Sequence, residues 1–198
     1  MRHLATKDVF RHWRRLRGRR RAPDRRSLNP AALGAALPDV FLLECAEGIV
    51  RVRLAGTRVC ALFGGELRGL AFESLFSHAS AADLAEILAA VLTDQSPAIA
   101  GLSALFPDRV SAEAELLLLP LTNDHGDGAP RILGVLTARG HRPSRHPPCA
   151  ALEVIAFRIL PDEDDAGAMP ETGTPLRRKA DTAAQRRARF RIYQGGAA

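Results

Sequence analysis

Two short stretches bring together side chains that can bind a metal ion. Residues 124–127 read Asp-His-Gly-Asp, and His141, His146 and Cys149 follow near three prolines. Zinc sites usually pair their ligands at short spacing, and the second stretch lacks such pairs. Asn, Asp and Gly are also the ordinary residues of a hairpin loop. We therefore interpret residues 123–130 as a hairpin loop and residues 141–149 as a linker, and we predict no metal site.

The residue types needed for catalysis do not form a readable arrangement. The Gly64-Gly65 pair lacks the flanking residues of a phosphate-binding loop or of a dinucleotide fingerprint, so it predicts tight turns instead. The sequence shows neither a Ser–His–Asp set nor a pair of carboxylates at catalytic spacing. We therefore predict a protein that is not an enzyme, and we name no catalytic residue.

Arginine is the most abundant functional side chain at the start of the chain. The 198 residues carry a net charge of +6, yet residues 1–26 alone hold eleven Lys or Arg and two acids, whereas residues 27–161 sum to −4. Guanidinium groups bind phosphates and carboxylates in a bidentate way. The charge indicates an acidic partner, nucleic acid or anionic lipid. It is equally explained by a composition that favours Arg over Lys, and a nucleic-acid-binding fold would normally carry its charge on the fold itself.

An amphipathic helix is predicted over residues 4–17, with Thr6 as a cap and Gly18 as its end. Val9, Trp13 and Leu16 fall at positions i, i+4 and i+7, which is one face of a helix. Such an apolar stripe must pack on the chain's own sheet or on a second copy. The candidate interaction residues are the stripe and the neighbouring arginines: Val9, Trp13, Leu16, Arg14, Arg17, Arg20 and Arg21.

The remaining pattern predicts an α+β fold. A hairpin of two strands comes first, then a helical insert, then strands that alternate apolar and polar residues. Residues 152–160 fit a strand or a short helix equally well. The predicted helices span 31–37, 58–63, part of 66–76 and 81–93, and the predicted strands span 40–45, 49–55, 99–106, 112–121 and 131–138. This order gives one antiparallel five-stranded sheet with helices on one face.

Three regions follow from this reading. Residues 1–27 form a basic N-terminal helix and arm, residues 28–160 form the folded domain, and residues 161–198 form a disordered basic tail in which 182–193 can be helical.

The turn between the second strand and the helical insert resembles the PAS domain. Residues 53–57 read Arg-Leu-Ala-Gly-Thr and residues 62–69 read Leu-Phe-Gly-Gly-Glu-Leu-Arg-Gly, as at the PAS strand-to-helix crossover. The upstream residues are similar to those of short stand-alone bacterial PAS-like proteins, and the likeness covers residues 8–140. The residues that carry this second likeness are Trp13, Leu16-Arg17-Gly18, Pro23, Arg25, Asn29-Pro30, Leu37-Pro38 and Phe41-Leu42-Leu43-Glu44.

The resemblance implies a sensory or protein-interaction fold and transfers no particular ligand. A PAS fold can enclose an apolar cleft, and its candidate lining here is Phe63, Phe72, Phe76 and Leu88, although such residues are more often ordinary core. His78 stands in the region where haem-binding PAS proteins place an axial ligand, but we interpret it as a surface histidine. Cys45 and Cys60 lack the motif of flavin-reactive cysteines and are expected to be structural thiols on a strand and a helix. The sequence identifies no particular cofactor, and the identity of any cofactor stays open.

These observations predict a sensory or regulatory module that acts through protein contact. A small ligand is a candidate gate, the output passes to a separate partner, and a homodimer or a protein partner is expected. The alternative is a protein that binds nucleic acid or an anionic membrane surface through its Arg-rich termini. Three widely spaced cysteines, no apolar run of about 18 residues and no signal sequence indicate a cytoplasmic protein without a membrane span.

Overall fold

The computed structural model describes residues 1–108, 111–123, 129–140 and 147–160. A helix comes first, α1 (Leu4–Arg17), followed by the 3₁₀ segments η1 (Arg25–Ser27) and η2 (Pro30–Asp39). The hairpin β1 (Val40–Ala46) and β2 (Ile49–Ala55) leads into the helical insert. The insert contains α2 (Thr57–Phe63), η3 (Phe72–Leu75), η4 (His78–Ser80) and α3 (Ala81–Leu92). Four strands follow: β3 (Ala98–Leu105), β4 (Ser111–Leu121), β5 (Arg131–Ala138) and β6 (Ala151–Ile159).

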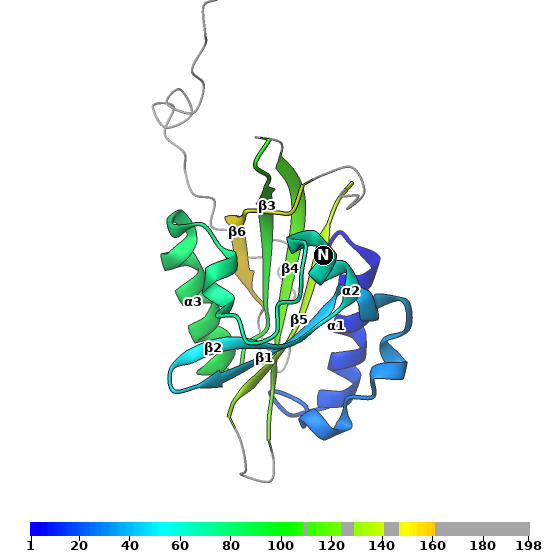
Figure 1. The fold of residues 1–198 in the computed structure, drawn as a ribbon. Helices are drawn as coiled ribbons and strands as arrows, with labels where there is room; N and C mark the ends of the chain where they lie inside the picture. The colour runs from blue at the N-terminus through cyan, green and yellow to red at the C-terminus, as the bar shows by residue number, and fades with distance from the viewer. Residues whose placement is uncertain (109–110, 124–128, 141–146, 161–198) are drawn as a thin grey trace, which may run out of the picture.

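All strands belong to one antiparallel sheet in the order β2-β1-β5-β4-β3-β6 (Figure 1). The predicted α+β class is therefore confirmed, and five of the strands are those predicted. The strand count was wrong by one, because residues 152–160 form part of β6, which pairs with β3 at the edge of the sheet. Periodicity alone could not decide between strand and helix for so short an apolar run.

Both faces of the sheet are covered, which the prediction of helices on one face did not include. Leu116 and Leu118 point into a core formed with the helical insert, whereas Leu117 and Leu119 point into a second core formed with α1 and η2. Successive side chains of a strand point to opposite faces. The uninterrupted leucine run of β4 is thus the run expected of a strand buried on both sides. Figure 1 shows α3 and α1 on opposite sides of the sheet.

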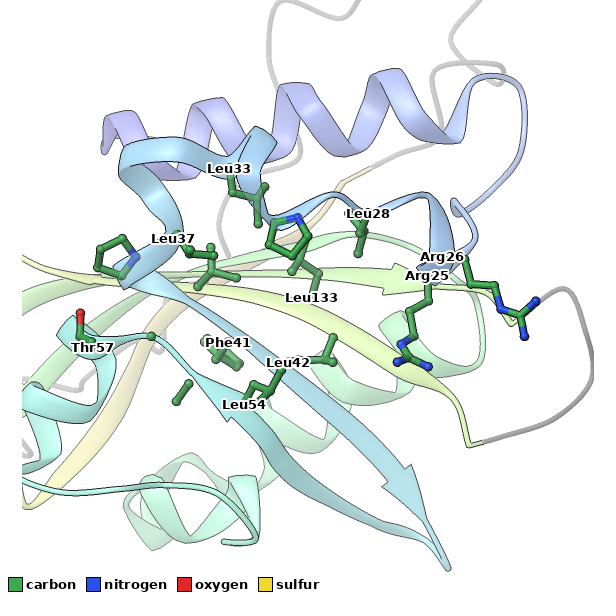
Figure 2. A pocket seen from close by; sticks show the side chains of 15 residues that line it. Arg25, Arg26, Leu28, Leu33, Leu37, Phe41, Leu42, Leu54, Thr57 and Leu133 are labelled. Carbon is green, nitrogen blue, oxygen red and sulfur yellow. The ribbon is translucent and has the colours of Figure 1, made fainter.

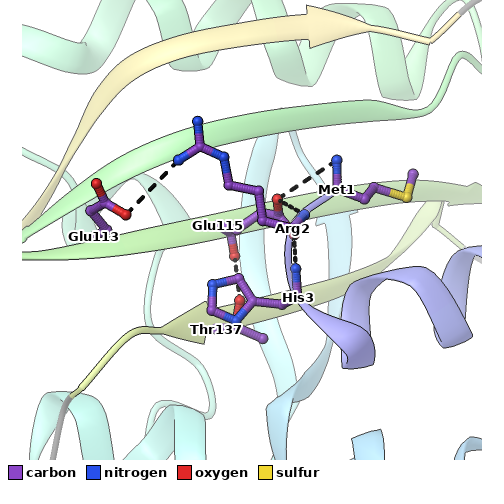
Figure 3. A network of polar contacts seen from close by, with 6 residues as sticks. All are labelled: Met1, Arg2, His3, Glu113, Glu115 and Thr137. Carbon is purple, nitrogen blue, oxygen red and sulfur yellow. Dashed lines mark hydrogen bonds and ion pairs between the residues drawn. The ribbon is translucent and has the colours of Figure 1, made fainter.

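Helix α1 is fastened to the sheet at its middle and at its start. The indole Nε1 of Trp13 donates to the Pro120 carbonyl oxygen at 2.9 Å. At the start of the helix, the Glu115 carboxylate accepts from the backbone N–H of Arg2 at 2.7 Å and of His3 at 3.4 Å (Figure 3). Thr6 was expected to cap this helix. Instead His3 occupies the N-cap position, and Thr6 is buried with no hydrogen bond to its hydroxyl among the described residues.

The segment between α1 and the hairpin is held by local hydrogen bonds. The Asn29 side chain accepts from the Ala31 N–H at 3.0 Å and caps η2, as the sequence predicts. Gly34 has a φ of 50°, a left-handed conformation that glycine adopts without strain, and it kinks η2 in its middle. Residues 31–37 were predicted as a short helix, and they form 3₁₀ turns interrupted at this kink. Within the described part of the chain, no helix has the length and apolar character needed to cross a bilayer.

Candidate functional site

An apolar groove with a volume of about 840 Å³ opens between η2 and the β1–β2 hairpin. Leu33 and Leu37 of η2 form one wall, and the cross-strand pair Leu42 and Leu54 forms the other. Leu133 of β5 lies between the two walls (Figure 2). Leu37 is 44% exposed and Leu54 is 61% exposed, so large apolar side chains meet water along this groove. Such a hollow has the size and lining of small-molecule sites, which occupy about 300–1,000 Å³.

The two ends of the groove differ in chemistry. Arg25 and Arg26 of η1 lie at one end, and Thr57, the first residue of α2, lies at the other (Figure 2). The arginines are exposed, and among the described residues neither guanidinium has a hydrogen-bond or ion-pair partner. One end of an apolar groove therefore presents two positive charges that no carboxylate of the described chain neutralises.

The carboxylate of Glu44 is fully engaged elsewhere. It contacts Arg53 Nε at 3.0 Å and Arg131 Nη2 at 2.7 Å, with its side chain only 18% exposed. Glu44 and Leu42 are two residues apart on β1 and so share a face of the sheet. Two arginine partners, one on β2 and one on β5, share this single carboxylate, so the cluster of three side chains has a net positive charge.

The other end of the groove is pinned by an ion pair. Asp39, the last residue of η2, is 7% exposed and accepts from the Arg58 guanidinium at 2.6 Å. Nearby, the Gly56 N–H donates to the Val40 carbonyl at 2.7 Å. A Cβ at Gly56 would overlap the carbonyl group of Pro38, so only glycine permits this close approach. These contacts hold the end of η2 against the start of α2.

One wall of the groove is also part of the packing of α1. Leu28 and Leu33 pack against the buried cluster that contains Val9 and Trp13 of α1. Ala36 of η2 is a buried member of the same cluster. A shift of η2 would therefore change the surface on which α1 rests.

The structure places the predicted cleft residues in a filled core. Phe72 stacks on Phe41 with ring centroids 5.5 Å apart and meets Phe76 edge-on at 5.2 Å. Phe72, Phe76 and Leu88 are buried members of this core, and Phe63 is half-buried against it. None of the four lines the groove. These contacts agree with the alternative that the sequence left open, in which the four residues belong to the ordinary hydrophobic core.

The predicted interaction residues divide into an inner and an outer set. Val9 and Trp13 are 1% exposed and pack on the chain's own sheet, the first of the two placements that the stripe allowed, and Leu16 is half-buried. Arg14 lies over the Phe10 ring and half-buried Arg17 lies over Trp13. The exposed members of the predicted set are Arg14, Arg20 and Arg21.

The other candidates have no shared site. His78 is exposed on η4, and Cys45 and Cys60 lie half-buried on β1 and α2, the strand and the helix predicted for them. Cys149 is 6% exposed, and burial raises the pKa of its thiol above the ordinary value. Residues 124–127 and 141–146 fall outside the described part of the chain. The described residues contain no group of three or more side chains that can hold a metal ion.

Sequence reasoning did not find the groove. Its two charged residues were counted within the basic arm, and its leucines were assigned to separate elements. Leu54 continues the apolar alternation of Val50 and Val52, so the sequence predicts it on the same face as those two core residues. A bulge between Leu42 and Leu43 moves Leu54 opposite Leu42, and the sequence does not reveal that register shift.

The sheet and its covering helices form a small α+β domain with an apolar groove at its surface. A family model described as the PAS domain matches residues 1–137. The chain therefore belongs to the PAS domain family, and the match includes α1 as well as the sheet through most of β5. PAS domains are generally sensory modules that mediate protein interaction, and they are generally not catalytic. A search of curated proteins found no match.

Proposed function

We propose that this protein is a regulatory module whose groove senses a small ligand and whose outer α1 surface passes the result to a separate protein partner. The observation that carries the proposal is the double role of η2: its Leu33 lines the groove and also packs against the cluster of α1, of which Ala36 is a buried member. A ligand that enters the groove contacts η2 first. Because α1 packs on the same cluster, a ligand bound in the groove can change how α1 packs on the sheet without any contact between the ligand and the helix.

The outer surface of α1 is suited to recognition by an acidic partner. Arg11, Arg14, Arg15 and the run Arg19–Arg21 are exposed there. Arginine is enriched at protein interfaces and binds carboxylates in a bidentate way. The partner surface would then carry Asp or Glu. A reducing cytoplasmic setting is part of this proposal, since the three cysteines are free.

Photo-crosslinking in the host cell tests this function. A photoreactive residue at Arg15 should yield one discrete protein adduct, and the same residue at exposed Glu73, on the helical insert, serves as the matched control. Leu42→Trp then fills the groove with a side chain of the chain itself. The proposal expects the Arg15 adduct to change in yield when the groove is filled. An adduct that is equal at both positions, or that does not respond to Leu42→Trp, would contradict it.

Self-association is the second form that protein contact can take. A cavity of about 510 Å³ lies on the α1 side of the sheet, between the start of α1 and strands β3, β4 and β6. Ile155 on this face is 47% exposed. If the chain dimerises across this face, Ile155→Asp should shift the species seen by light scattering from dimer to monomer. A wild-type chain that stays monomeric at all concentrations would remove this form of the proposal.

The exposed arginines also favour a second candidate function, which is binding to nucleic acid or to an anionic membrane surface. Arg19–Arg21, Arg25 and Arg26 are all exposed, so this arm presents a run of positive charge at the surface. Contacts of this kind lose affinity steeply as salt rises. Binding to duplex DNA or to anionic vesicles should therefore be measurable at about 50 mM salt and fall by at least about a hundredfold by about 200 mM. Undetectable binding at the lower salt would exclude this function.

A further inference from the structure

We propose that the groove binds a single-chain amphiphilic anion, with its apolar tail along the η2–hairpin leucines and its anionic head against Arg25 and Arg26. This inference rests on the proposed regulatory function and names the ligand class of that site. The site lies on the α1 side of the sheet, whereas the cleft predicted from the sequence lies among the helical insert and is filled by Phe72 and Phe76.

The lining of the groove fits a hydrocarbon chain. Of the fifteen described residues that line it, thirteen carry no charge, and the leucines among them come from both walls and the floor. Leu37 and Leu54 are exposed without a ligand, so a chain that covers them removes apolar surface from water. Thr57, at the far end, supplies the one side-chain hydroxyl of the lining. That end has no charged side chain that could bind a second charged group of the ligand.

The head group follows from the two charged lining residues. Arg25 and Arg26 are adjacent in η1, and within the described chain no carboxylate contacts either guanidinium. The nearest candidate on the hairpin, Glu44, is held by Arg53 and Arg131. Asp24 directs its side chain to the backbone N–H of Arg26 and so caps η1. A carboxylate or phosphate head is the group that two such guanidinium groups recognise.

A peptide is a less suitable occupant. Strand β1 pairs with β2 on one side and with β5 on the other, so its backbone offers no free edge for strand addition. The outer edge of β2 is partly taken up by residues 69–71, since the Val52 N–H donates to the Leu70 carbonyl and the Gly69 N–H donates to the Val52 carbonyl. Recognition must therefore come from side chains, and the volume of about 840 Å³ lies within the small-molecule range.

The first test is direct binding of hexadecanoate to the full chain, below the micellar concentration, by displacement of a dansyl-labelled undecanoic acid. Hexadecanoate should compete, and a series from octanoate upward should gain about fourfold in affinity per added methylene until the groove is full. Hexadecanol and hexadecylamine keep the tail but lack the anionic head. They should bind at least about tenfold more weakly, which is the scale of a charge-assisted hydrogen bond. Equal binding of the acid and the amine would overturn the proposal.

Two matched pairs of variants locate the site. Arg25→Glu with Arg26→Glu should weaken hexadecanoate by about tenfold or more, whereas the same charge change at exposed Arg15 and Arg19 should leave its affinity within about twofold. Leu54→Asp places a carboxylate in the tail channel and should abolish displacement, whereas Leu4→Asp, at an exposed leucine outside the groove, should not. Circular dichroism confirms that each variant is folded. Affinity unchanged by both groove variants would overturn the proposal.

The outcomes separate the ligand class from the regulatory function. If hexadecanoate fails to bind while Leu42→Trp still changes the crosslink at Arg15, the ligand class is wrong and the regulatory function stands. If hexadecanoate binds in the groove but leaves the Arg15 crosslink unchanged, the ligand class stands and the regulatory function is wrong. If an amphipathic acidic peptide displaces the dansyl probe and hexadecanoate does not, the occupant is a protein segment and this proposal is overturned.

Discussion

Trp13 of α1 donates its indole N–H to the carbonyl oxygen of Pro120 on β4 at 2.9 Å, in a contact between elements more than a hundred residues apart. Trp13 is 1% exposed, and it belongs to the same buried cluster as Leu117 and Leu119 of β4. The N-terminal helix is therefore a layer of the domain, and its arginines stand on a surface that the sheet holds in position.

Replacing Trp13 tests this attachment. Trp13→Phe keeps most of the packing but leaves the Pro120 carbonyl without its indole donor, so the free energy of unfolding should fall by about 1–3 kcal/mol. Leu4→Ala on the same helix removes a side chain that is 73% exposed and should change the stability by less than about 0.5 kcal/mol. Urea denaturation measures both. Equal stability of the two variants would show that α1 does not rest on the sheet.

Glu115 and Glu113 provide a matched pair on one strand. The Glu115 carboxylate accepts from the N–H groups of Arg2 and His3, whereas Glu113 is 71% exposed and contacts arginines only at 3.9–4.0 Å (Figure 3). Glu115→Gln should destabilise the protein by about 1–3 kcal/mol and raise amide hydrogen exchange over the first turns of α1. Glu113→Gln should have an effect below about 0.5 kcal/mol, since exposed ion pairs contribute little. The reverse order of effects would contradict this assignment.

Gly134 on β5 is required by the ring of Phe41 on the neighbouring strand. The two residues are paired across β1 and β5, and a Cβ at position 134 would overlap the ring. Gly134→Ala should therefore cost about 1–3 kcal/mol, because the well-packed core around Phe41 must move. Gly101→Ala on β3 is the control, since its Cβ would approach only the Ala156 carbonyl oxygen at 3.9 Å. Thermal unfolding should show a large shift at position 134 and little or none at position 101.

Much of the fold was readable because its elements obey simple periods. The hairpin Val40–Ala46 and Ile49–Ala55 alternates along its second strand, and α3 repeats its apolar residues at helical spacing, so both were predicted almost to the residue. The run Leu116–Leu119 also indicates that both faces of the sheet are covered, which the predicted arrangement of helices on one face did not include. Four consecutive buried residues require cover on both faces, and the amphipathic helix predicted at residues 4–17 was a candidate to supply it.

The candidate site was not readable from the sequence, because it depends on tertiary placement. Arg25 and Arg26 are two of eleven basic residues in the first 26, and nothing local distinguishes them from Arg19 or Arg20. The kink at Gly34 and the bulge beside Leu42 both lie in the elements that bring η2 and Leu54 to the same groove, and neither is visible in the sequence. Phe72 and Phe76 illustrate a second difficulty, because apolar residues on converging elements read alike in the sequence whether they line a cleft or pack against each other, as these two do.

Cysteine chemistry gives a prediction on pH. Burial raises the pKa of the Cys149 thiol above its ordinary value of 9.0, so the folded state holds this proton more tightly than the unfolded state. The protonated Cys149 thiol therefore contributes to the stability of the folded state fully at a pH below its pKa in the unfolded state. This contribution is lost as the pH rises through its pKa in the folded state. Cys149 should therefore react with iodoacetamide more slowly than half-buried Cys45 and Cys60 in native protein. Equal labelling rates by mass spectrometry would contradict this burial.

Leu42→Trp combined with amide hydrogen exchange tests the central claim, the coupling of the groove to α1, most directly. Leu42 lies on the hairpin wall, and the larger side chain occupies the groove without depending on the identity of any ligand. We expect changed protection in residues 30–39 and 4–17, with residues 81–92 of α3 unchanged as an internal control. If protection changes only in the hairpin, residues 40–55, then filling the groove does not alter α1 through η2, and the proposed coupling is wrong.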